Sequence, residues 1–121
     1  MGVQRSLVKS FYFAFEGIKQ ALKEEPNLRI HILIGLVSFV LAFFLGFSKI
    51  EWVILIFTVL FVLILELINT AIEDTVNLAS PQVSKEAKVA KDVMAAAVLF
   101  GALLSVIVGL FLFLPKLINF F

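Results

Sequence analysis

Four polar side chains recur at helical spacing next to a strongly apolar stretch, and their residue types could do chemistry. Glu66, Asn69, Glu73 and Asn77 follow the run 52–65, which contains no turn-forming residue. In one continuous helix, at about 100° per residue, the four side chains fall within an arc of roughly 80°. Carboxylates are energetically expensive at membrane depth, so this polar stripe indicates a functional site. A structural polar seam or a pore lining is the alternative interpretation.

The composition is that of a membrane protein. Of the 121 residues, 62% are hydrophobic and only 16% are charged, which is far from the balance of soluble domains. The length suits a single domain over residues 1–121. The absence of cysteine excludes disulfides and cysteine nucleophiles. The formal net charge of +1 gives no nucleic-acid-binding footprint.

The elements that position the stripe are predicted to be helices, so the fold class is an all-α membrane protein. In the first segment, apolar residues recur at spacings of three and four opposite most of the charges, which is typical of an amphipathic helix on a membrane surface. Pro26 breaks this helix and leaves Glu25 at a corner, and Asn27 is the expected N-cap of the next helix. We expect a surface helix over 5–24, membrane helices over 28–47, 52–77 and 93–114, a polar loop over 79–89, and a helix end at Pro115.

The basic residues predict the orientation of these spans. Lys and Arg are concentrated before the first span and between the second and third spans. The positive-inside rule therefore places the N-terminus and the second loop in the cytoplasm. Glu25, Glu73, Lys91 and Asp92 would then gather at the cytoplasmic face. His31 lies near the headgroups in this topology, and we expect it to be interfacial or in polar contact with the site.

This set of residues suggests phosphoryl transfer to a lipid. Mg²⁺ prefers one or two carboxylates together with substrate phosphates, and Lys91 could offset phosphate charge. Glu66 lies deeper, where a lipid hydroxyl would sit, and could act as its base. Transfer from a nucleotide to a lipid alcohol fits these parts. A small ion-coupled transporter, with Glu66 as the proton-binding group, is the alternative from a different class.

The stretch from Glu66 to Glu73, followed by Ala90-Lys91-Asp92, resembles the signature of the small bacterial membrane kinases of the diacylglycerol kinase and undecaprenol kinase family. The resemblance covers the chain from about residue 9 to residue 116. The segments 50–52 and 113–117 are most similar to the Gram-positive branch, whose members act on undecaprenol.

The resemblance implies a homotrimer with active sites shared between neighbouring subunits, in the bacterial plasma membrane. It also implies ATP, Mg²⁺ and a lipid alcohol substrate, with undecaprenol expected and diacylglycerol as the alternative. Carried over by position, the catalytic base is Glu66, the metal-holding acids are Glu25 and Glu73, and the nucleotide site comprises Glu25, Asn69, Glu73, Lys91 and Asp92.

Three positions depart from the family pattern. Asn77 stands where the family usually has Asp, so one negative charge is missing from the cytoplasmic end of the stripe. Asp74 supplies a charge where another residue is common. Phe13 replaces a Tyr expected near the nucleotide, so a hydroxyl contact is absent there.

Overall fold

The structure, a computed structural model, describes residues 6–121 as an arrangement of helices. Over this range the helices are α1 (Leu7–Glu24), α2 (Pro26–Phe44), α3 (Lys49–Ala79) and α4 (Lys85–Phe120), and no strand occurs among the described residues. By length and composition, α2, α3 and α4 are each suited to cross a membrane, which confirms the three predicted spans. The predicted start of the surface helix at Arg5 lies outside the described residues.

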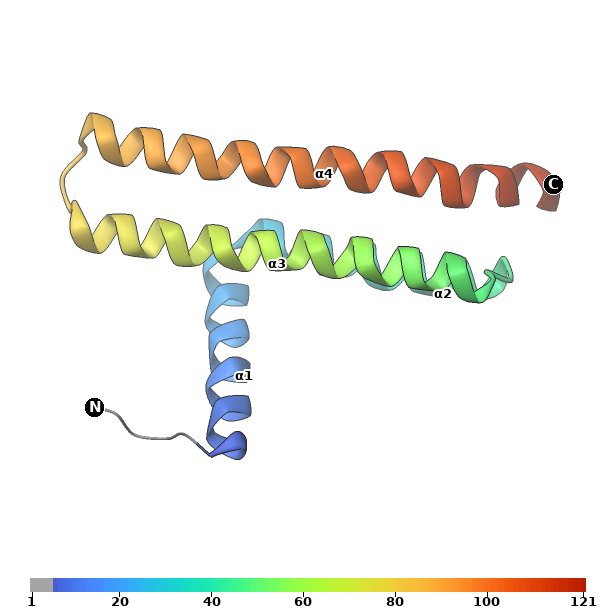
Figure 1. Cartoon of the computed structure of the whole chain (residues 1–121), viewed down its shortest axis with the longest axis horizontal. Coiled ribbons are helices and arrows are strands. Elements are labelled where there is room, and N and C mark those ends of the chain that lie inside the picture. Colours follow the sequence, from blue (N-terminus) through green and yellow to red (C-terminus); the bar gives the residue numbers. More distant parts are fainter. Residues whose placement is uncertain (1–5) are drawn as a thin grey trace.

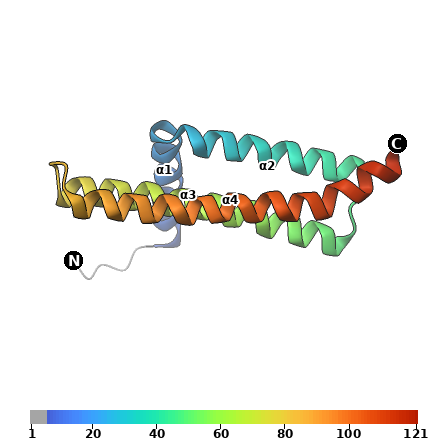
Figure 2. The same cartoon turned by 90° about the horizontal axis from the view of Figure 1, so that it is seen from above.

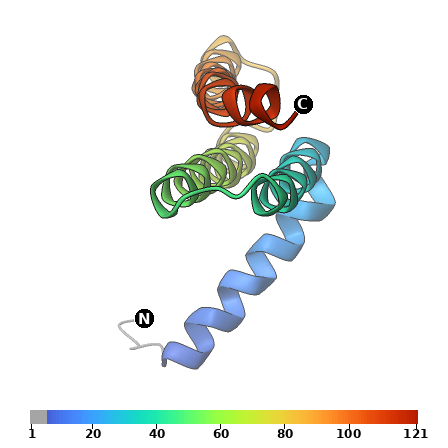
Figure 3. The ribbon, with the colours of Figure 1, turned by 90° about the vertical axis from the view of Figure 1, so that its right-hand side faces the viewer.

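The three long helices run side by side, and α1 crosses their direction (Figure 1). The α3–α4 loop is at one end of the bundle, and the α2–α3 turn and the C-terminus are at the other (Figure 2). Seen end-on, α3 packs against both α2 and α4, while α1 extends away from the bundle (Figure 3). Large apolar side chains face outward, such as Phe57 on α3, which is 70% exposed. These surfaces suit contact with lipid or with other subunits.

The corner between α1 and α2 is formed by Glu25 and Pro26. The backbone N–H of Glu25 closes α1 on the carbonyl of Ala21 at 2.9 Å, and the extended backbone of Glu25 is also the N-cap of α2. Pro26 is the first residue of α2, where its missing N–H would have no partner in any case. The prediction of Asn27 as the N-cap was therefore wrong, and α2 spans Pro26–Phe44 instead of 28–47.

The turn from α2 to α3 is short and firmly capped. Gly46 adopts a φ of +69°, a conformation that favours glycine. Ser48 and Glu51 then form a reciprocal capping box at the start of α3, with the Ser48 N–H donating to Glu51 Oε1 at 2.9 Å. This cap starts α3 at Lys49, ahead of the predicted residue 52. The structure also confirms the predicted continuation of the helix through the polar region, since α3 ends at Ala79.

Two boundary predictions for α4 were wrong. The expected loop over 79–89 is shorter, because Ser84 accepts a hydrogen bond from the Ala87 N–H at 3.1 Å and starts α4 at Lys85. The other end continues through Pro115 to Phe120. Proline within a helix removes one backbone hydrogen bond, and here the loss falls near the end of a 36-residue helix that tolerates it.

Candidate active site

The continuous α3 helix places the predicted stripe at successive depths along one side. Glu66 is fully buried at 1% exposure, whereas Asn69 and Glu73 are half-buried and Asn77 is exposed. At 1.5 Å per residue, Glu66 lies about 10 Å deeper along α3 than Glu73. The stripe therefore runs from the water-exposed end of the bundle into its apolar interior.

Glu66 meets a histidine from the neighbouring helix. The Nδ1 atom of His31 on α2 lies 2.9 Å from Oε1 of Glu66. The two atoms are at ion-pair distance without the angle of a hydrogen bond, and neither has a hydrogen-bond partner elsewhere in residues 6–121. This contact confirms the expectation that His31 is interfacial or touches the site, and it identifies Glu66 as the group touched.

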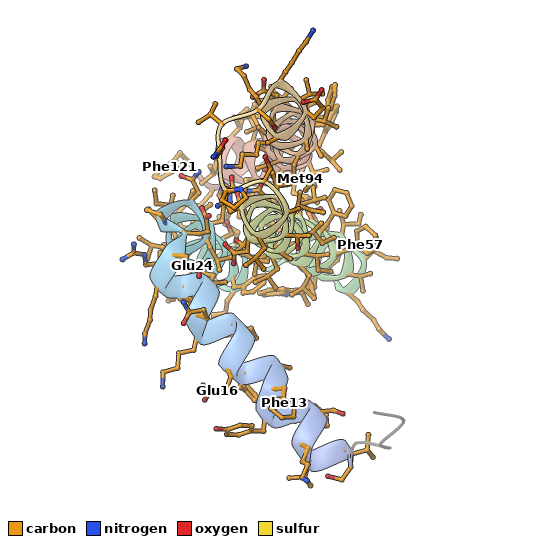
Figure 4. All side chains as sticks on the ribbon, turned by 90° about the vertical axis from the view of Figure 1, so that its left-hand side faces the viewer. Phe13, Glu16, Glu24, Phe57, Met94 and Phe121 are labelled. Atoms are coloured by element: carbon orange, nitrogen blue, oxygen red, sulfur yellow. The ribbon has the colours of Figure 1, made fainter. Side chains whose placement is uncertain are left out.

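A second acidic contact forms at the α1–α2 corner, where Glu25 reaches α3. Its side chain shares a hydrogen bond with that of Glu73. Burial raises the pKa of Glu25 to about 7 from its ordinary value of 4.5, and the hydrogen bond and negative charge of Glu73 add to the rise. Beside this pair, Glu24 shares a hydrogen bond with Asp74. Figure 4 shows Glu24 at the end of α1 that meets the bundle.

The pair of Glu25 and Glu73 fits a divalent cation. Two carboxyl groups that share a proton at a partly water-exposed corner can exchange that proton for a metal ion. No cluster of three or more His, Asp or Glu side chains able to hold a metal occurs among the described residues. A site with two protein carboxylates is typical of Mg²⁺, which takes its other ligands from water and substrate phosphates.

The predicted nucleotide-site residues of α4 lie at the water-exposed end of α3. Lys91 Nζ donates to Asn77 Oδ1 at 2.7 Å, which links α4 to the end of the stripe. Asp92 pairs instead with Lys88, at 2.6 Å between Nζ and Oδ2. All four side chains line a polar cavity of about 320 Å³ under the α3–α4 loop. Asn69 makes no hydrogen bond within residues 6–121, so the structure joins it to no other site residue.

Sequence reasoning did not find the cavity beside His31. It has a volume of about 350 Å³ and lies between α2, α3 and α4. On α2, His31, Gly35 and Ser38 share the face that lines it. Their spacing of four and three residues, with one ionisable and two small side chains in an apolar helix, was the available signal.

One known protein family matches most of this chain. The family model described as prokaryotic diacylglycerol kinase matches residues 12–113. The chain belongs to this family. It is a membrane lipid kinase, an enzyme that takes its phosphoryl group from a nucleotide, and its three apolar helices make it a multi-pass membrane protein.

Individual relatives match this kinase over most of its length. The undecaprenol kinase of Bacillus subtilis is 40% identical over 109 residues, which cover 90% of this chain and 89% of the relative. The diacylglycerol kinase of Synechocystis is 41% identical over 118 residues, covering 97% of this chain and 67% of the relative. The diacylglycerol kinase of Escherichia coli K12 is 31% identical over 101 residues, covering 84% and 83% respectively.

Proposed function

We propose that this kinase transfers the γ-phosphate of ATP to the hydroxyl of undecaprenol, forming undecaprenyl phosphate. The match to the Bacillus subtilis undecaprenol kinase supports this substrate, because it covers about nine-tenths of both chains. Diacylglycerol is the second candidate, supported by the 41% identity to the Synechocystis diacylglycerol kinase. Both lipids offer a primary hydroxyl to the same chemistry.

The observation that carries the proposal is the depth difference between two groups of acids. Glu66 is buried in the apolar interior, while Glu25 and Glu73 meet about 10 Å nearer to water. A nucleotide approaches from the aqueous side and a lipid hydroxyl from the membrane side. Glu66 is therefore the carboxylate that can take the hydroxyl proton while the lipid oxygen attacks the γ-phosphorus and ADP leaves.

We assign Glu25 and Glu73 to Mg²⁺, and Lys91 and Asp92 to the nucleotide. When bound, Mg²⁺ neutralises charge on the transferring phosphates. The ammonium group of Lys91 lies in the polar cavity under the α3–α4 loop, where it can offset phosphate charge. Asn69 lies between Glu66 and Glu73 along α3, and its amide has no hydrogen bond in the described chain that would compete with a nucleotide.

The proposal extends to assembly and orientation. We propose a homotrimer in the bacterial plasma membrane, with active sites shared between neighbouring subunits and facing the cytoplasm. The outward-facing apolar surfaces of the helices are suited to such contacts. A cytoplasmic face for Glu25, Glu73 and Lys91 is required if the phosphate donor is cellular ATP. We also propose that α1 lies on the membrane surface, since Leu7, Phe11 and Phe15 are exposed along it.

The direct test is an assay of the purified protein with labelled ATP and each lipid alcohol. Glu66→Gln keeps the shape of the side chain and removes its basicity, so turnover should fall by about 10² to 10⁴ while ATP affinity stays near that of the parent. The matched control is Glu86→Gln, which removes an exposed carboxylate from the first turn of α4 and should retain the parent rate.

Two results would contradict the assignment. If the parent transferred no phosphate to either lipid, the lipid kinase proposal would fail for both substrates. If Glu66→Gln turned over at the parent rate, or lost only ATP binding, another group would be the base, with Asp92 and Asp74 the next candidates. The ratio of turnover on undecaprenol to that on diacylglycerol decides between the two substrates.

A further inference from the structure

A buried general base must release the proton it accepts before the next turnover. Glu66 is 1% exposed, so its carboxyl group has almost no contact with water. Its backbone carbonyl accepts a hydrogen bond from Thr70 Oγ1 at 3.0 Å, but Thr70 is also buried and cannot serve as a base. The proton needs a second group between Glu66 and solvent.

His31 is the ionisable group in contact with the Glu66 carboxyl. Its Nδ1 lies 2.9 Å from Glu66 Oε1, and its side chain is 24% exposed where that of Glu66 is 1% exposed. Neither atom is engaged by a hydrogen bond within residues 6–121. Imidazole accepts and releases protons near neutral pH, which a hydroxyl or an amide does not.

A charged group approaches this contact from the α1–α2 corner, and the other residues that line the cavity beside His31 are uncharged. The corner residue Glu25 is close enough for its charge to interact with that of Glu66. From α4, the residues that line the cavity beside His31 are uncharged, and they include Ala102, Ser105 and Gly109. From α3, the cavity lining is likewise uncharged. A cationic imidazole would therefore find its counter-charge in Glu66, which is the pairing that a buried carboxylate requires.

We propose that His31 is a positioning residue that holds the Glu66 carboxylate and receives from it the proton lost by the lipid hydroxyl. The inference rests on the proposed function, since it needs Glu66 as the base. The lipid O–H bond breaks as the new O–P bond forms and the bond to ADP breaks, and the proton passes to Glu66. Neutral His31 then accepts this proton across the Nδ1–Oε1 contact, and the resulting imidazolium releases one proton to water at its exposed edge. Glu66 is left ionised and His31 neutral, so no other reactant is needed.

The test is chemical rescue of His31→Ala in the full-length chain reconstituted in lipid. The kcat should fall by at least about tenfold, which is a smaller loss than the factor of about 10² to 10⁴ expected for Glu66→Gln. The KM for ATP should stay unchanged. Added imidazole can reach the cavity that His31 lines, and it should raise kcat in proportion to its concentration. Pyrrole has the same ring size without the basic nitrogen and should give no rescue.

Ser38→Ala is the matched control, because Ser38 lines the same cavity from the same helix and its hydroxyl donates to the Ile34 carbonyl of its own helix. It should keep the parent kcat and show no response to imidazole. If His31→Ala does not fold, His31→Gln retains a polar side chain and replaces it in the same assay.

A folded His31 variant with the parent kcat would overturn the inference. Equal rescue by imidazole and pyrrole would also overturn it, because cavity filling would then explain the effect. In both cases the loss of turnover in Glu66→Gln would still support the kinase mechanism. A parent protein without lipid kinase activity would instead remove the proposed function on which the inference rests.

Discussion

At the scale of single residues, the contact between Glu25 and Glu73 links metal binding to protonation. The two carboxyl groups come from different helices, and burial together with Glu73 raises the pKa of Glu25 to about 7. Between its ordinary value of 4.5 and about 7, Glu25 binds more protons in the folded protein than in the unfolded chain. The stability that this proton provides is present at low pH and is lost as pH rises through about 7.

Binding of Mg²⁺ should therefore strengthen with pH. A cation must displace the shared proton, so we expect affinity about tenfold weaker at about pH 6 than at about pH 8. Either Glu25→Gln or Glu73→Gln should weaken Mg²⁺ and nucleotide binding together, because the ion bridges protein and phosphates. Calorimetric titration at both pH values measures this. Glu86→Gln should behave like the parent, and an unchanged Mg²⁺ dependence in both site variants would rule out the assignment.

At the scale of elements, the approach of α2 to α3 depends on Gly35. A Cβ at this position would lie 2.8 Å from Val59 Cγ1, and a β-branched valine has little freedom to move away. Gly35→Ala should therefore destabilise the protein by about 1–3 kcal/mol. Gly17 on α1 has no atom within 4 Å of the corresponding point, so Gly17→Ala should instead stabilise the helix by about 0.5–1 kcal/mol. Denaturant unfolding in detergent compares the two, and equal effects would contradict this packing argument.

The proposed surface position of α1 is tested through its apolar stripe. Phe11 and Phe15 are 63% and 67% exposed. Both belong to α1, which extends away from the bundle (Figure 3). Replacing both with Asp puts charge on the face expected to enter the lipid boundary, which should loosen the helix from vesicles. Lys19 should then react faster with a water-soluble amine label. Lys9→Asp places an acid on the opposite face and should change this much less, and unchanged labelling of Lys19 in the double variant would argue against a surface helix.

The helices could be predicted from the sequence where a long apolar or periodic pattern indicates them, but the residues at which they begin and end could not. The apolar runs identified all three membrane helices, and the helical period identified the stripe from Glu66 to Asn77. Residues 85–89 were predicted as part of a loop because they are rich in charge, yet they form a helix because Ser84 caps it and α3 packs beside it. For the same reason the contact of Lys88 with Asp92, four residues apart on that helix, was missed.

The contacts of the candidate site were likewise predictable only in part. The topology predicted that Glu25 would lie near Glu73, since both fall at one end of the bundle. The partner of Glu66 depends on how α2 is rotated against α3, which is set by the close approach of Gly35 to Val59. A single sequence does not encode this rotation in any local pattern. The sequence therefore allowed a contact between His31 and the site, but only the arrangement of the helices identified Glu66 as the partner of His31.

At the scale of the whole molecule, the lengths of the helices divide the protein into a membrane part and a projecting part. At 1.5 Å per residue, the 19-residue α2 extends about 28 Å. This length is close to the thickness of the hydrocarbon core of a bilayer, which is about 30 Å. The 31-residue α3 and 36-residue α4 extend about 46 Å and 54 Å, so both project beyond it. At the end with the α3–α4 loop, α3 and α4 continue past the level of α1 (Figure 1). We therefore expect Lys91 and Asp92, the residues of α4 proposed for the nucleotide site, to lie in water, and Glu66 to lie in the apolar part.

The orientation of this projecting end is the last prediction. Lys85, Lys88 and Lys91 all lie at the start of α4, whereas the opposite end carries Lys49 and Lys116, of which Lys116 is paired with Glu51 at 3.0 Å. The positive charge is thus concentrated at the end with the α3–α4 loop, which the positive-inside rule assigns to the cytoplasm. A reporter inserted at the exposed Gln82 should report a cytoplasmic location, and one fused after Phe121 an external location. A fusion at Gly46, in the α2–α3 turn, is the control and should agree with the Phe121 fusion. The reverse pattern would separate the acidic pair and Lys91 from cellular ATP, and would contradict the proposed kinase orientation.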